Sequence, residues 1–89
     1  MNGMIVIEHL DWLGTSEGLE EYCSAVKKAV SDTPDAKYIG TYRPVSNMYT
    51  HSLFFEVKDF ATLDKVYHNF HYKRDRKTLP HVMQEFFIS

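Results

Sequence analysis

The sequence predicts an α+β domain whose elements follow one another in the order strand, helix, strand, strand, helix, strand. Two segments repeat apolar residues every three or four positions, as amphipathic helices do. Four other segments are rich in β-branched and aromatic residues and lack that period, which is typical of strands. The 89 residues are enough for one domain, spanning residues 1–89, and too few for two separate cores.

The first strand is predicted over residues 4–12, where a β-branched and aromatic run precedes a glycine. Ser16 is the expected N-cap of the helix that follows, because its side-chain oxygen can accept a hydrogen bond from a free backbone N–H. Glutamates on the first turns and lysines towards the end match the dipole of this helix. The helix is expected to end before Pro34, because proline disfavours helical geometry in the preceding residue.

The second half of the chain predicts a hairpin, a helix and a last strand. Residues 36–45 and 49–57 are rich in aromatic and β-branched residues and flank a short polar stretch, which indicates the hairpin. Asp59 is the expected N-cap of the second helix, which carries the second apolar stripe. Pro80 interrupts the chain before a last strand over residues 81–88.

This order of elements is the split βαβ arrangement of ferredoxin-like folds. Right-handed crossovers place four antiparallel strands in the order 4-1-3-2 and set both helices against one face of the sheet. We therefore expect the other face to lack cover from its own chain.

Alternation along the strands sorts the side chains onto the two faces of the predicted sheet. A wholly apolar set is assigned to the helix side: Ile5, Ile7, Ile39, Leu53, Phe55 and Val57. The other parity assigns these residues to the open face: Val6, Glu8, Leu10, Trp12, Tyr38, Tyr42, Ser52, Phe54 and Glu56. Because this second set is largely apolar yet carries two carboxylates and two phenols, it predicts a dimer interface, a ligand pocket or both.

The short length, the order of elements and the aromatic, partly polar open face resemble the dimeric α/β-barrel superfamily. This superfamily includes antibiotic-biosynthesis monooxygenases, haem-degrading monooxygenases and stress-responsive barrel proteins. The resemblance implies a homodimer in which two sheets close face to face, with a small ligand in the barrel or between the sheet and its helices. It also implies a monooxygenase-like activity, either cofactor-independent or haem-linked. The segment 68–72 (HNFHY) is similar in place to a histidine-containing segment of some monooxygenases, which makes His71 a candidate contact to a ligand or haem.

Two glutamates are the candidate catalytic residues of the open face. Glu8 and Glu56 have the same predicted parity on neighbouring strands, so their carboxylates are expected to lie close together. Two carboxylates in a low-dielectric site do not ionise together, so one of them is suited to proton transfer. Together with Tyr42 they form the predicted catalytic set, which would bind and deprotonate a phenolic or enolisable substrate. The expected ligand contacts are Trp12, Tyr38, Phe54 and His71.

The alternative for the two glutamates is structural. In that case they pair with charged or hydroxyl groups across a dimer interface, since ion pairs in interfaces perturb carboxylates as active sites do. Cys23 falls within the apolar stripe of the first helix, where core packing is expected. His68 is expected at the surface, and the five histidines lack any HExxH-like spacing, so no metal is predicted.

Net charge and composition limit the classes of partner that this protein can bind. A net charge of −2 and a sequence pI of about 6.2 argue against a dedicated nucleic-acid binder. The run 73–77 (KRDRK) is the local exception, and it is either a solvated loop or a contact for a phosphate, a carboxylate or nucleic acid. One cysteine excludes an internal disulfide and no apolar run is long enough to span a bilayer, so we expect a cytoplasmic protein without a membrane partner.

The sequence is compatible with two classes of function. The first is a small oxygenase that needs no cofactor of its own or works with haem, acting on a small aromatic or apolar ligand. The second is a non-enzymatic dimer that binds a ligand or another protein. The sequence contains no triad, metal motif or phosphate loop that decides between them.

Overall fold

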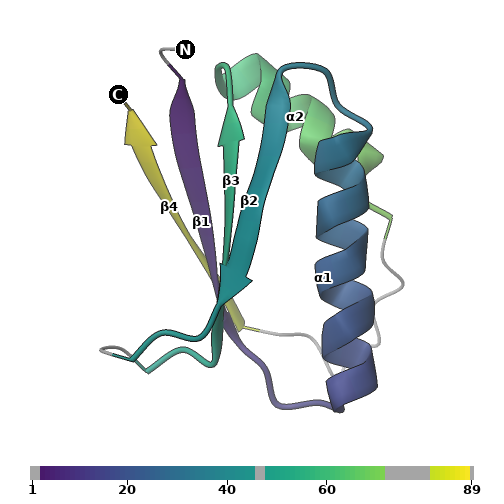
Figure 1. Ribbon diagram of the computed structural model, residues 1–89, viewed down its shortest axis with the longest axis vertical. Coiled ribbons are helices and arrows are strands. Elements are labelled where there is room, and N and C mark those ends of the chain that lie inside the picture. Colours follow the sequence, from purple (N-terminus) through teal and green to yellow (C-terminus); the bar gives the residue numbers. More distant parts are fainter. Residues whose placement is uncertain (1–2, 46–47, 72–80, 89) are drawn as a thin grey trace.

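Four antiparallel strands form one open sheet, and two helices pack against one of its faces (Figure 1). The computed structural model describes residues 3–45, 48–71 and 81–88. The elements in chain order are β1 (Met4–Asp11), α1 (Ser16–Ser31), β2 (Ala36–Tyr42), β3 (His51–Val57), α2 (Phe60–Asn69) and β4 (His81–Ile88). This α+β architecture is consistent with a ferredoxin-like fold.

The strands lie in the order β2-β3-β1-β4, which is the predicted order 4-1-3-2 read from the opposite edge. Every neighbouring pair is antiparallel. Met4 lies opposite both Val57 and Ile88, so the central strand β1 starts beside the ends of its two neighbours. β1, the first strand of the chain, therefore lies between β3 and β4 in the sheet.

Both helices begin at side chains that cap free backbone N–H groups. Thr15 accepts a hydrogen bond from the backbone N–H of Gly18 at 3.0 Å, so the cap of α1 lies one residue before the predicted Ser16. The predicted cap of α2 is confirmed, because the Asp59 carboxylate accepts from the backbone N–H and the hydroxyl of Thr62, each at 2.8 Å. These caps set where each helix starts over the sheet.

The core lies between the helices and the sheet. It is built from alternate residues of β1 and β3 and from the apolar stripes of both helices. Its buried members are Met4, Val6, Leu10, Tyr22, Val26, Ala29, Val30, Leu53, Phe55, Val57, Leu63 and Val66.

The strand β1 presents to the helices the residues that were predicted for the open face. Its register with β3 places Val6 opposite Phe55 and Glu8 opposite Leu53, and directly opposite residues share a face of a sheet. The prediction was wrong because residues 4–7 are apolar at every position, so either parity fits the pattern. Ile5 and Ile7, which were predicted for the helix side, lie on the open face instead.

A bulge in β2 changes which residues of that strand face the core. The register with β3 shifts between Tyr38 and Gly40, which breaks the alternation within the strand. Tyr38, which precedes the bulge and lies opposite Phe55, packs against the core rather than on the open face. Tyr42 lies on the open face as predicted, and Ile39 is exposed rather than buried.

Candidate functional site

Glu8 is a carboxylate buried between the sheet and the helices. β1 carries it on the helix-covered face, and the residue is 4% exposed. A polar group removed from water in this way must be hydrogen-bonded or paired, because desolvation alone costs several kcal/mol. The hydroxyl of Tyr22 on α1 donates a hydrogen bond to Glu8 Oε1 at 2.8 Å. The core thus contains a polar centre built from β1 and α1.

Burial and the negative charge of Glu8 raise the pKa of three further side chains. Burial raises the pKa of the Cys23 thiol and of the Tyr38 phenol, and the charge of Glu8 raises both further. Burial, with the Glu8 charge second, raises the pKa of Tyr67 on α2 to about 12. The three groups are therefore protonated at neutral pH. We call Glu8, Tyr22, Cys23, Tyr38 and Tyr67 the Glu8 cluster.

The Glu8 cluster reaches the surface between α2 and β4. Gln84 of β4 lies directly opposite Glu8 in the sheet, and its side-chain amide donates a hydrogen bond to the hydroxyl of Tyr67. Both Tyr67 and Gln84 are exposed to solvent. These two residues were not among the predicted site residues, although a tyrosine within an apolar stripe indicates a polar partner for its hydroxyl.

An aromatic wall stands beside Glu8. The ring of Tyr22 lies 5.9 Å from that of Trp12 and 5.6 Å from that of Phe70, measured between centroids. The indole N–H of Trp12 donates to the backbone carbonyl of Thr15 at 2.8 Å, which fixes the indole at the start of α1. Trp12, predicted for the open face, therefore lies on the helix side, in contact with the cluster through Tyr22.

Tyr42, Phe54 and Glu56, the other half of the predicted site, lie on the open face. The rings of Tyr42 and Phe54 meet edge to face with centroids 5.5 Å apart. Glu56 lies opposite Ile5, on the face away from Glu8. Glu8 and Glu56 therefore do not form the expected pair of neighbouring carboxylates, because the register of β1 places Glu8 on the helix-covered face and Glu56 lies on the open face.

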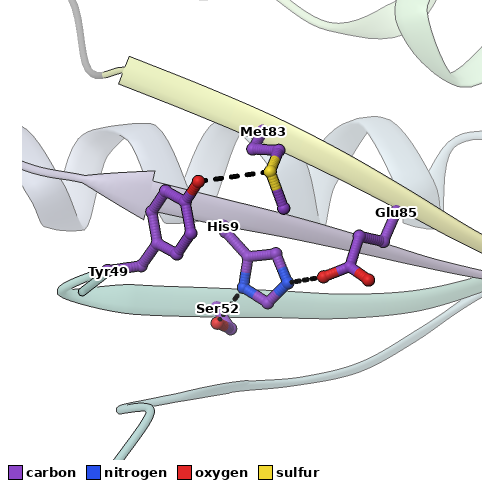
Figure 2. A network of polar contacts seen from close by, with 5 residues as sticks. All are labelled: His9, Tyr49, Ser52, Met83 and Glu85. Carbon is purple, nitrogen blue, oxygen red and sulfur yellow. Dashed lines mark hydrogen bonds and ion pairs between the residues drawn. The ribbon is translucent and has the colours of Figure 1, made fainter. Parts of the chain in front are cut away.

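A second polar network, not predicted from the sequence, lies on the open face (Figure 2). The buried imidazole of His9 has its Nδ1 atom 2.7 Å from Ser52 Oγ and its Nε2 atom 2.5 Å from Glu85 Oε1. The ring of Tyr49 stacks on this imidazole at a centroid distance of 5.1 Å. The Tyr49 hydroxyl donates to the sulfur of Met83 at 3.2 Å. The network joins β1, β3 and β4 across the centre of the sheet.

Serine, histidine and glutamate are also the components of a nucleophilic triad, but here their arrangement is structural. Ser52 is 3% exposed, and it lies within β3, whose backbone pairs with strands on both sides. A serine nucleophile needs substrate access and nearby N–H donors for the developing oxyanion. It also faces Nε2 of its histidine in the usual triad, whereas Ser52 faces Nδ1 of His9. We therefore assign this network to holding the strands together.

The remaining candidates are two histidines near the end of α2 and the basic run. His71 is exposed, two positions beyond the last residue of α2, and its role as a contact to a ligand or haem stays a prediction. His68 is exposed, as predicted. In the described ranges no three histidine, cysteine or acidic side chains are grouped to hold a metal ion, and no helix is long and apolar enough to cross a membrane. The basic run 73–77 lies outside the described residues.

No family model, curated protein or solved structure matches this chain. The resemblance to the dimeric α/β-barrel superfamily therefore stays a prediction. The function has to be argued from the chemistry of the Glu8 cluster and of the open sheet face.

Proposed function

We propose that this protein binds a small aromatic ligand between its helices and its sheet, with a hydroxyl group of the ligand at Glu8. The observation that supports this is the burial of Glu8, 4% exposed, in a core that otherwise consists largely of hydrocarbon. The fold does not need this group for its stability, because replacing a buried charge with a well-packed apolar residue is often neutral or stabilising. Buried ionisable residues of this kind are typical of binding and catalytic sites.

The cluster suits a ligand with an acidic proton, such as a phenol or an enolisable carbonyl compound. The protonated hydroxyls of Tyr38 and Tyr67 can donate hydrogen bonds, and the Glu8 carboxylate, which accepts from Tyr22, can accept a further one from the ligand. For proton abstraction, Glu8 takes the proton and the electron pair stays on the ligand. That transfer would be the first step of a monooxygenase-like reaction, whereas binding alone needs only the hydrogen bond.

Phenol itself is the probe that tests this proposal. We expect wild-type protein to bind phenol in a ligand-observed NMR titration. Glu8→Gln should weaken binding tenfold or more, because it removes a hydrogen bond to a charged group, worth about 1.5–3 kcal/mol. Glutamine has the shape of glutamate and still accepts from Tyr22, so the fold should survive.

Glu56→Gln is the matched control, since it makes the same chemical change on the opposite face of the sheet. It should leave the dissociation constant of phenol unchanged. If wild-type protein does not bind phenol, or if both variants bind it as tightly as wild type, the proposal is wrong.

We also propose that a second copy of this chain covers the open sheet face. The single chain has 6136 Å² of accessible surface, about 700 Å² more than mass scaling gives for a compact monomer of this size. An uncovered sheet face is consistent with such an excess, and a standard interface buries roughly 800 Å² on each partner. The face also exposes apolar side chains, among them Tyr42 and Phe87.

Sedimentation velocity tests the homodimer. We expect wild-type protein to sediment as a dimer at micromolar concentration. Tyr42→Arg should shift it towards monomer, because it adds a charge to the exposed part of the open face. A monomer at all concentrations, or a dimer that Tyr42→Arg does not weaken, would show that the open face is not the interface.

A further inference from the structure

Apolar side chains gather where the Glu8 cluster reaches the surface. Phe60 opens α2 and Phe86 lies on β4, and their ring centroids are 6.1 Å apart. Both remain open to water, 60% and 41% exposed respectively. Ile88, two positions beyond Phe86 on the same face of β4, is 77% exposed. An exposed apolar row of this kind on a small protein indicates a binding surface.

This row is continuous with the Glu8 cluster. Gln84, Phe86 and Ile88 alternate along β4 on the helix-facing side, and Gln84 lies directly opposite Glu8. On α2, Phe60 and Tyr67 are seven positions apart, which places them on the same side of the helix. The pairs Phe60 with Phe86 and Tyr67 with Gln84 therefore form two successive steps from the surface towards Glu8.

We infer that the ligand is elongated, with a polar hydroxyl head at Glu8 and an apolar tail that runs along β4 past Phe86 towards Ile88. The inference rests on the proposed function and adds the shape and chemical class of the ligand, a hydroxyl compound such as a phenol that carries an alkyl chain. The strand rises about 3.3 Å per residue, so the path from Gln84 to Ile88 accommodates a tail of about 13 Å. A compact ligand would occupy Glu8 and leave this row in water.

A series of 4-alkylphenols from 4-methylphenol to 4-butylphenol measures the tail contact. In wild-type protein the dissociation constant should fall about three- to fourfold with each added methylene, the ratio expected when each CH₂ leaves water for an apolar surface. Ligand-observed NMR titration gives each constant. Glu8→Gln should weaken all members of the series by the same factor, because it changes only the head contact.

Phe86 and Phe87 provide a matched pair of variants, since they are neighbours on β4 that face opposite sides of the sheet and are both exposed. Phe86→Ser should flatten the dependence on chain length while leaving the affinity for phenol unchanged. Phe87→Ser should leave the whole series as in wild type. Far-UV circular dichroism of both variants checks that the fold is retained.

The outcomes separate the two proposals. If phenol binds and Glu8→Gln weakens it, but longer chains add no affinity, the elongated ligand is wrong and the head site stands. If Phe87→Ser flattens the series and Phe86→Ser does not, the tail lies on the open face and the inference is wrong. If no member of the series binds wild-type protein, the proposed function and the inference both fail.

Discussion

Replacing His9 by alanine should destabilise the fold substantially, because one imidazole joins three strands. The change leaves the buried Ser52 hydroxyl without its bond to the imidazole, which costs about 1–3 kcal/mol. It also removes the ring stacked on Tyr49, a contact worth about 0.5–1.5 kcal/mol. The Glu85 side chain is 42% exposed, so its ion pair with His9 adds at most about 1 kcal/mol. Together these contributions predict a loss of about 1.5–5.5 kcal/mol in the free energy of unfolding.

Urea denaturation followed by circular dichroism measures this loss, at several protein concentrations so that any dissociation of a dimer is recognised. The double variant with Ser52→Ala completes a mutant cycle, in which we expect a coupling energy of about 1–2 kcal/mol between the two side chains. Glu85→Gln is the exposed control and should cost less than about 1 kcal/mol. The reasoning is refuted if His9→Ala costs less than Glu85→Gln, or if His9 and Ser52 behave additively.

Three further predictions concern the core, a helix cap and the Glu8 cluster. Phe55 is fully buried, so Phe55→Ala should cost about 3–5 kcal/mol in urea denaturation; a loss below 1 kcal/mol would contradict its place in the core. Hydrogen bonds from Thr62 lower the pKa of Asp59 below its ordinary 3.8, so its stabilisation is present above that value and is lost as the pH falls through the lower folded value. The stability difference between wild type and Asp59→Asn should therefore shrink on acidification, and a constant difference would refute this. Because the pKa of Tyr67 is raised from 10.0 to about 12, wild-type protein should lose stability between these pH values, and Tyr67→Phe should lose less; equal slopes would show that Tyr67 does not titrate as described.

The order of the elements was predictable because its signals are local. The periodicity of the two helices and the β-branched runs lie within each segment, and the crossover rule then orders the strands. The cap of α2 was also predictable, since Asp59 and Thr62 are neighbours on one turn.

The faces of the sheet were not predictable, because parity in β1 depends on its partner strand. Residues 4–7 are apolar at every position, so only the pairing of Glu8 with Leu53 shows which side the carboxylate faces. In β2 the bulge after Tyr38 breaks an alternation that a sequence can only be assumed to follow. Both effects moved residues of the candidate site from one face of the sheet to the other.

The polar contacts of the two faces were hidden for a related reason. Tyr22 donates to Glu8 from another element, and His9 meets Glu85 across 76 positions of the chain. No local pattern encodes such a contact. The sequence does show a polar group, such as a tyrosine hydroxyl, within an otherwise apolar stripe. Such a group indicates that a hydrogen-bond partner exists, but not which residue it is.

The position of β1 between β3 and β4 has a consequence for how the chain folds during synthesis. β1 is translated before its partner strands, which begin at His51 and His81. Its hydrogen bonds in the sheet can therefore form only after those segments have left the ribosome. Pairings between such distant segments raise the contact order, so this α+β domain should refold more slowly than a helical bundle of the same size. Until then the apolar run 4–7 has no partner strand, which leaves it open to aggregation in the nascent chain.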